Sequence, residues 1–219
     1  MNLDWVVNHA DEIWSLTVTH LWLTLSATAI GLVISIPLGY IAYRFKKLHF
    51  FIVGGTSLFF TLPSLALFVL LPKILGTRIL DPVNVVVALA IYTVSLLTRV
   101  VADGLASIPH EAVDAATGIG YTSAQMFFKV QFPLAIPPLI SGLRVVVVTN
   151  ISIATMAAVI GVAQLGTLFT IGFTRNQLVP IITGLIVCLL LSLILDRLLA
   201  LLGRVVTPWR AVTHQGRAG

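Results

Sequence analysis

Five long apolar stretches constrain this chain more than any other feature of its sequence. A helix rises about 1.5 Å per residue, so crossing the roughly 30 Å hydrocarbon core of a membrane takes about 20 mainly apolar residues. Windows of about that length cover residues 21–43, 50–71, 83–101, 134–160 and 178–202. In lipid, a helix satisfies its backbone N–H and C=O groups within its own segment. The pattern predicts an all-α polytopic membrane protein with about five transmembrane helices.

The composition excludes a water-facing surface. Charged residues make up 10% of the 219 residues and hydrophobic residues 58%, whereas soluble domains carry about 25% charged residues. The net charge of +5 therefore indicates basic loops beside anionic lipid rather than a nucleic-acid-binding surface. We expect one transmembrane domain over residues 1–219, embedded in the bilayer.

Charges at the segment ends predict the orientation. The N-terminal segment carries Asp4, Asp11 and Glu12 and no basic residue before the first window, which also argues against a cleavable signal peptide. Basic residues are richest in alternate loops and in the expected tail at 203–219: Arg44, Lys46, Lys47, Lys129, Arg204, Arg210 and Arg217. The positive-inside rule then places the N-terminus outside and the C-terminus in the cytoplasm. We expect the chain to lie in the cell membrane, that is, the inner or plasma membrane.

The stretch 107–133 interrupts the apolar pattern and is predicted to be a cytoplasmic elbow. Ser107 is expected to cap a short helix whose first turn holds Pro109, a residue suited to a helix start. Gly118 and Gly120 are expected to end this helix, because glycine adopts the conformations that close helices. The elbow then needs a second short helix to return the chain to the membrane.

The second elbow helix and the surface of the first complete the pattern. Thr122 and Gln125 have the spacing of a capping box, and Pro133 is expected to stop the second helix. The first helix carries two acids among small side chains: Glu111, Asp114, Ala115 and Ala116. Such a slim helix suits the groove of a protein partner. Packing of the elbow on its own chain is the alternative that these residues leave open.

The elbow resembles the EAA motif of ABC importer permeases. That motif reads E-A-A, three residues, G, nine residues, I, one residue, L-P. The chain has the same spacing in Asp114-Ala115-Ala116, Gly120, Val130 and Phe132-Pro133. The replacements of Glu by Asp, Ile by Val and Leu by Phe keep the chemical type. The motif also lies before the penultimate span, as in that family.

The resemblance extends over about residues 20–202 and implies a function. Residues 61–67 and 150–161 are similar to the quaternary-amine branch of the family. The resemblance implies the permease of an ATP-driven importer that takes up osmoprotectants such as glycine betaine, carnitine or choline by alternating access. An importer permease for another small solute such as an amino acid, an ion-coupled secondary transporter and a purely structural membrane subunit are the alternatives.

The resemblance also implies partners. In this family the elbow is the coupling helix, here carrying Glu111, Asp114, Ala115, Ala116, Gly118 and Gly120. It contacts a cytoplasmic ABC ATPase dimer, and the pore contains a second permease chain, identical or related. A separate extracytoplasmic binding protein delivers the substrate. The chain has no G-x-x-x-x-G-K-[ST] loop, catalytic constellation or metal-binding spacing. We therefore expect no cofactor here, with ATP and Mg on the ATPase.

Polar residues inside the apolar windows are candidates for the substrate pathway: Pro63, Ser64, Asn150, Ser152 and Thr155. Pro63 either kinks its span or breaks it beside a pathway. The polar residues of the fourth span either join helices or line a cavity. Residues 161–180 have room for a re-entrant element.

Two further expectations concern charged residues in the spans. Arg99 and Asp103 are four positions apart at the cytoplasmic end of the third span, which favours an ion pair on one helix face. The fifth span is expected to pack against lipid, with Asp196 and Arg197 near its inner end.

Overall fold

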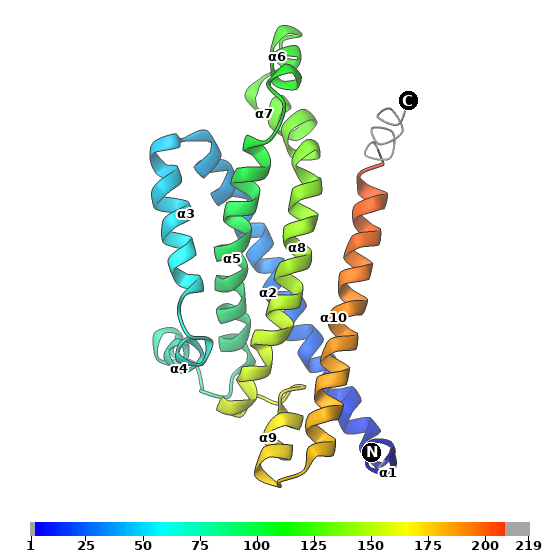
Figure 1. Ribbon diagram of the computed structural model, residues 1–219. Helices are drawn as coiled ribbons and strands as arrows, with labels where there is room; N and C mark the ends of the chain where they lie inside the picture. The colour runs from blue at the N-terminus through cyan, green and yellow to red at the C-terminus, as the bar shows by residue number, and fades with distance from the viewer. Residues whose placement is uncertain (1–2, 209–219) are drawn as a thin grey trace.

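A computed structural model describes residues 3–208 as helices joined by short connections (Figure 1). The elements are α1 (Leu3–Asn8), α2 (Ala10–Arg44), α3 (Lys46–Phe60), α4 (Ser64–Leu75), α5 (Pro82–Ala106), α6 (His110–Gly118), α7 (Ser123–Met126), a π-helical turn η1 (Phe127–Gln131), α8 (Phe132–Ala154), a 3-10 turn η2 (Thr155–Ile160), α9 (Thr167–Thr174) and α10 (Leu178–Val206). Residues 3–208 contain no strand, which confirms the all-α prediction. Most of the predicted tail, residues 209–219, lies outside the described residues.

Four stretches of the described chain are long and apolar enough to cross a membrane: Ala10–Arg44, Pro82–Ala106, Ser123–Ile160 and Leu178–Val206. The bent pair α3 and α4 supplies a fifth if the two are counted as one span. Their axes differ by 104°, so Pro63 breaks the helix rather than kinking it. The break follows from the proline, which lacks an N–H and holds an extended ψ of 128° at the start of α4.

Helix α5 is the centre of the molecule and packs against α2, α3, α4 and α8. Within its apolar window 67% of the residues are buried, against 22% for α10, which touches mainly α8 and α9. Small residues allow the closest crossing, since a Cβ atom added to Gly39 of α2 would lie 2.5 Å from Cβ of Val101 in α5. The α2–α5–α8 core is thus the rigid frame that holds the two ends of the bundle.

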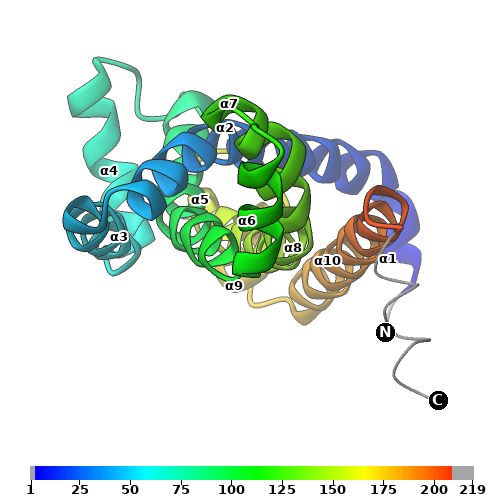
Figure 2. The same cartoon turned by 90° about the horizontal axis from the view of Figure 1, so that it is seen from above.

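The two ends of the bundle differ. Helices α6 and α7 extend beyond the spans at one end, and α1, α4 and α9 lie at the other (Figure 1). Seen from the elbow end, α6 lies over the middle of the bundle, with α3 and α10 on opposite sides (Figure 2). The segment 161–180 contains α9, a helix of 8 residues and therefore about 12 Å, too short to span.

Candidate functional site

Helix α6 begins two residues later than its sequence suggested, at His110. Ser107 does not cap α6: its hydroxyl donates to the Gly104 carbonyl at 2.9 Å and ends α5 instead. Pro109 precedes α6 with ψ 133°, and no side chain caps the helix. The reason lies in Ile108, which is buried in the cluster beneath the elbow and precedes a proline, so it takes no helical conformation.

The turn between the two elbow helices follows the prediction. Helix α6 ends at Gly118, and Gly120 adopts a left-handed φ of +84°, which glycine accepts without strain. Thr122 then starts the next helix with a capping box, as predicted. Its Oγ1 accepts from the Gln125 amide at 3.3 Å, and the Gln125 side chain accepts from the Thr122 amide at 2.9 Å.

The second elbow helix does not stop at Pro133, so that prediction is wrong. The chain runs through the π turn η1 into α8, and Pro133 lies in the first turn of α8. In η1 the Phe132 amide donates to the Phe127 carbonyl, five residues back. This wider turn shifts the helix register where proline lacks an N–H. One continuous helical stretch, Ser123–Ile160, therefore joins the elbow to the core.

Five of the six predicted coupling residues are exposed on α6 and the turn after it: Glu111, Asp114, Ala115, Gly118 and Gly120. The sixth, Ala116, is buried and faces the chain's own packing. Neither acid forms a hydrogen bond or ion pair with another described side chain. The structure adds two bare apolar side chains that sequence reasoning missed, Ile119 at 72% and Phe128 at 69% exposure. The elbow thus exposes both acidic and apolar side chains.

Asn150, one of the predicted pathway residues, lies in the core. It is 1% exposed, and its Nδ2 donates to Oγ1 of Thr28 at 3.0 Å and to Oγ1 of Thr93 at 2.8 Å. These bonds tie α8 to α2 and α5. In this geometry Asn150 joins helices and faces no open space.

The other predicted pathway residues lie near two interruptions of the spans. Pro63 is exposed and Ser64 half-buried at the α3–α4 break, where the Tyr92 hydroxyl donates to the Leu62 carbonyl at 2.6 Å. Ser152 is exposed, and the hydroxyl of half-buried Thr155 donates to its carbonyl at 2.7 Å as α8 tightens into η2. Helix α4 packs against η2, so the two interruptions are neighbours.

A buried network that the sequence did not reveal holds the chain after η2. Gln164 Oε1 accepts from the Gly166 amide at 2.6 Å and lies 2.9 Å from Nδ1 of His20. Its Nε2 donates to the Thr155 carbonyl at 3.1 Å. Nε2 of His20 lies 3.1 Å from the Ile151 carbonyl. Both side chains are fully buried. His20 is 144 positions from Gln164, so no local pattern could have paired them.

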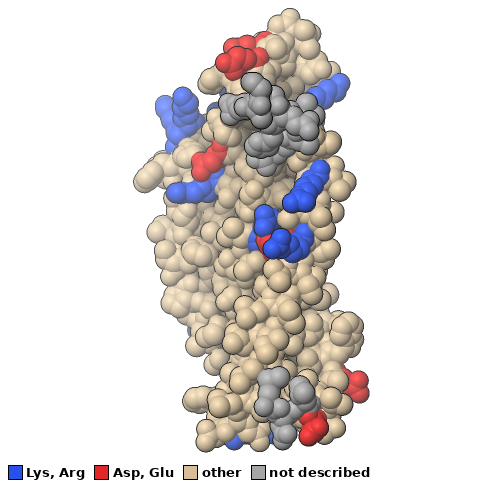
Figure 3. Space-filling model, turned by 45° about the vertical axis from the view of Figure 1, so that its right-hand side comes forward, with Lys and Arg blue, Asp and Glu red and all other residues tan. Residues whose placement is uncertain are grey.

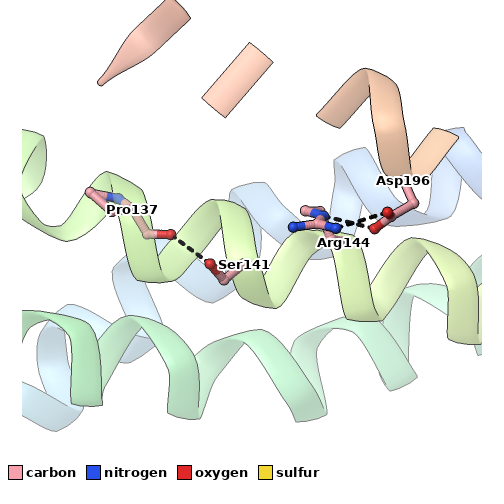
Figure 4. A network of polar contacts seen from close by, with 4 residues as sticks. All are labelled: Pro137, Ser141, Arg144 and Asp196. Atoms are coloured by element: carbon pink, nitrogen blue, oxygen red, sulfur yellow. Dashed lines mark hydrogen bonds and ion pairs between the residues drawn. The ribbon is translucent and has the colours of Figure 1, made fainter. Parts of the chain in front are cut away.

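A mid-span ion pair joins α8 to α10 (Figure 4). Nε of Arg144 donates to one Asp196 oxygen at 2.7 Å and Nη2 to the other at 2.8 Å, a two-bond geometry that fixes both side chains. The pair lies on the surface, with the side chains 38% and 25% exposed. Figure 3 shows basic and acidic side chains grouped at mid-height on the face it displays.

The predicted pair of Arg99 and Asp103 does not form. Both side chains are exposed, and within residues 3–208 the ion pair found is that of Arg144 and Asp196. An acid that follows its basic partner by four positions is the weaker order on a helix, and exposed pairs gain little over solvation.

Comparison with known proteins identifies relatives across most of the chain. Residues 22–208 match the family described as "Binding-protein-dependent transport system inner membrane component". The osmoprotectant import permease protein OsmW of Salmonella typhimurium is 34% identical over 211 residues, which cover 94% of this chain and 97% of that protein. The glycine betaine/carnitine/choline transport system permease protein OpuCB of Bacillus subtilis is 33% identical and covers 86% of each chain.

A solved structure shares the fold. The MetNI methionine ABC transporter, in a crystal form described as inward facing, contains a chain that superposes with a TM-score of 0.83 at 22% identity. The match covers 91% of this chain and 98% of that one. It confirms the fold class predicted from the sequence.

Proposed function

The chain belongs to the family of inner membrane components of binding-protein-dependent transport systems, and on that premise we propose how its parts serve an ABC importer. The chain is the permease of such an importer. We propose that its substrates are osmoprotectants such as glycine betaine, carnitine or choline. The names of the relatives and the extent of the matched chain support this substrate class. An ion-coupled mechanism, the alternative from sequence, is not favoured by this family.

The open surface of α6 is the observation that carries the coupling proposal. Helix α6 projects beyond the spans (Figure 1) and presents Glu111 and Asp114 beside Ala115 without partners in the described chain. We propose that α6 seats in a cleft of a cytoplasmic ATPase dimer, which binds ATP and Mg and carries out hydrolysis. The exposed side chains of Ile119 and Phe128, also on the elbow, supply apolar contacts to the same partner.

The continuous stretch Ser123–Ile160 supports a route from the elbow to the pathway. Helices α7, η1 and α8 follow one another without a non-helical break, and the short turn at residues 119–122 joins them to α6, so a displacement of the elbow can pass along this stretch. Closure of the ATPase dimer then favours one access state by the difference in its binding energy for the two states. The interruptions at Pro63 and Thr155 lie at the far end of this route, and we propose that Pro63, Ser64, Ser152 and Thr155 border the substrate pathway, with Asn150 tying the helices behind it.

The proposed complex has further members. A second permease chain, identical or related, completes the pore, and a separate extracytoplasmic binding protein delivers the substrate. A quaternary amine is held best by aromatic rings, and we assign that recognition mainly to the binding protein.

The charge distribution supports an orientation with the elbow in the cytoplasm. The described basic residues at the elbow end are Arg44, Lys46, Lys47, Arg99, Lys129 and Arg204. The other end has Lys73, Arg78 and Arg175. The excess of basic residues at the elbow end favours that end as cytoplasmic.

Uptake of radiolabelled glycine betaine by cells that carry the whole transporter tests the proposal. We expect Asp114→Lys and Gly120→Arg to abolish uptake, because the first reverses an exposed charge and the second places a bulky side chain at a left-handed turn. Asp11→Lys, the same exchange at the opposite end, is the matched control and should keep uptake. Normal uptake by either elbow variant would contradict the coupling role. Normal uptake of an unrelated amino acid and none of glycine betaine by the wild type would contradict the substrate class.

A further inference from the structure

A pocket of about 440 Å³ opens at the elbow end of the bundle, where α2, α3, α5 and α6 meet. It is lined by Ala42, Tyr43, Lys46, His49, Ala102, Ala106, Ile108, His110 and Val113. The proposed coupling acids of α6 are not among these residues. We propose that this pocket binds the anionic headgroup of a phospholipid from the leaflet on the elbow side of the membrane.

The polar side of the pocket is basic. Lys46 and His49 come from α3 and His110 from α6, and no Asp or Glu lines the pocket. The acids nearest in sequence, Asp103 on α5 and Glu111 on α6, are exposed outside it. An ammonium group and two imidazoles offer hydrogen-bond donors from two sides to a phosphate, and the Lys46 charge favours an anion.

The backbone adds to this preference. Lys46 is the first residue of α3 and His110 the first of α6, and neither helix start has a side-chain cap. The first amides of a helix lack intrahelical partners and carry its positive dipole end. The Tyr43 hydroxyl accepts from Nε2 of Gln131 at 3.4 Å, which leaves its own O–H free to donate.

The apolar side of the pocket distinguishes a lipid from a free phosphate. Ala42 and Ala102 form its floor where α2 and α5 cross, each 1% exposed, and Ala106 continues it. These short side chains leave an apolar hollow between the ends of the spans. A hollow with a basic rim fits a molecule whose phosphate continues into glycerol and acyl chains. The occupant would also bridge α3 and α6, which no hydrogen bond or ion pair joins among the described residues.

Two variants remove the two halves of the proposed site. Lys46→Gln with His49→Gln takes away the α3 donors at the rim, and Ala106→Phe fills the hollow from an exposed position at the end of α5. Lys47→Gln is the matched control, since it loses the same charge next to the site but does not line it. Retention of the ATPase by the purified transporter checks that each variant folds.

Native mass spectrometry of the intact transporter, titrated with phosphatidylglycerol or phosphatidylcholine, measures the binding. We expect the wild type and Lys47→Gln to hold one more phosphatidylglycerol per permease chain than the two pocket variants. The affinity should fall about fivefold for the loss of Lys46, with no difference for phosphatidylcholine. Equal retention by the pocket variants and Lys47→Gln would overturn the proposal. Displacement of phosphatidylglycerol by inorganic phosphate would assign the site to free phosphate and overturn the lipid.

Discussion

The buried network around Gln164 and the elbow surface around Asp114 use polar groups in opposite ways. Gln164 is fully buried, and both ends of its amide have partners from other segments, His20 at the oxygen and Thr155 at the nitrogen. Asp114 is exposed and has no hydrogen bond or ion pair with another described side chain. Some of the few polar side chains in this chain form hydrogen bonds inside the bundle and hold the spans together. Others stay exposed and form no hydrogen bond with another described side chain. The free groups mark where a partner is expected to bind.

This contrast predicts two kinds of mutational effect. Changes in the network should reduce the stability of the isolated permease, because buried polar groups lose their partners. Changes on the elbow should leave that stability unaltered and reduce assembly.

The largest loss of stability is expected for Gln164→Leu. Leucine leaves the Gly166 N–H and the Thr155 carbonyl without their partner, and His20 loses one as well. Each of the two unsatisfied backbone groups costs about 1–3 kcal/mol, so we expect a loss of about 2–6 kcal/mol in the free energy of unfolding. Denaturant unfolding of the detergent-purified permease measures it. The control is Thr149→Val, whose hydroxyl bonds only within α8. A loss for Gln164→Leu no greater than that of the control would show that the buried network does not stabilise the permease.

A smaller loss is expected for Asn150→Leu. Its amide joins three helices through hydroxyl groups that can turn to carbonyls of their own helices, as those of Thr28 and Thr93 already do. Hydrogen bonds between membrane helices are worth about 0.6–1.7 kcal/mol each. We expect about 1–2 kcal/mol in the same unfolding experiment. A value near zero would show that packing alone holds α8 against α2 and α5.

The ion pair of Arg144 and Asp196 should rank below the buried network, since both side chains are partly exposed. We expect Arg144→Leu to lower the melting temperature by less than Gln164→Leu, because Asp196 alone loses its partner, whereas Gln164→Leu leaves three groups without one. Replacing both residues by leucine should recover part of the loss, since no unpaired carboxylate remains. A double variant less stable than Arg144→Leu would contradict this account of the pair.

The smallest effect on stability is expected for Ile119→Ser with Phe128→Ser. Both side chains are mostly exposed on the elbow, so their removal opens no cavity in the described structure. We expect an unchanged melting temperature and weaker binding of the ATPase, measured by titrating it onto the purified permease. A clear drop in melting temperature would show that these side chains pack on the chain itself.

Local patterns predicted the fold and much of the elbow. Four of the five apolar windows are confirmed as long helical stretches and the window at 50–71 as two helices broken at Pro63. The Thr122–Gln125 capping box forms because its partners are three residues apart. The predictions at Ser107 and Pro133 failed where tertiary context decided. Buried Ile108 moved the start of α6, and the π turn before Pro133 let the helix continue.

Long-range pairings were beyond reach of the sequence. The Arg144–Asp196 pair spans 52 positions and the His20–Gln164 contact 144. The i,i+4 rule instead favoured a pair of Arg99 with Asp103. Both side chains are exposed, so solvent can satisfy each of them without the other. The sequence likewise left two roles open for Asn150, lining a pathway or joining helices. Its role depends on which helices surround it, and the sequence does not show this.

The ratio of ATPase to permease that co-purifies from native membranes tests the central claim most directly. It is measured by mass spectrometry for C-terminally tagged wild type, Asp114→Lys and Asp11→Lys, with the melting temperature of each permease beside it. We predict a stoichiometric ATPase with the wild type and Asp11→Lys, its loss with Asp114→Lys, and equal melting temperatures. A stoichiometric ATPase with Asp114→Lys would contradict the assignment of the elbow as the coupling surface.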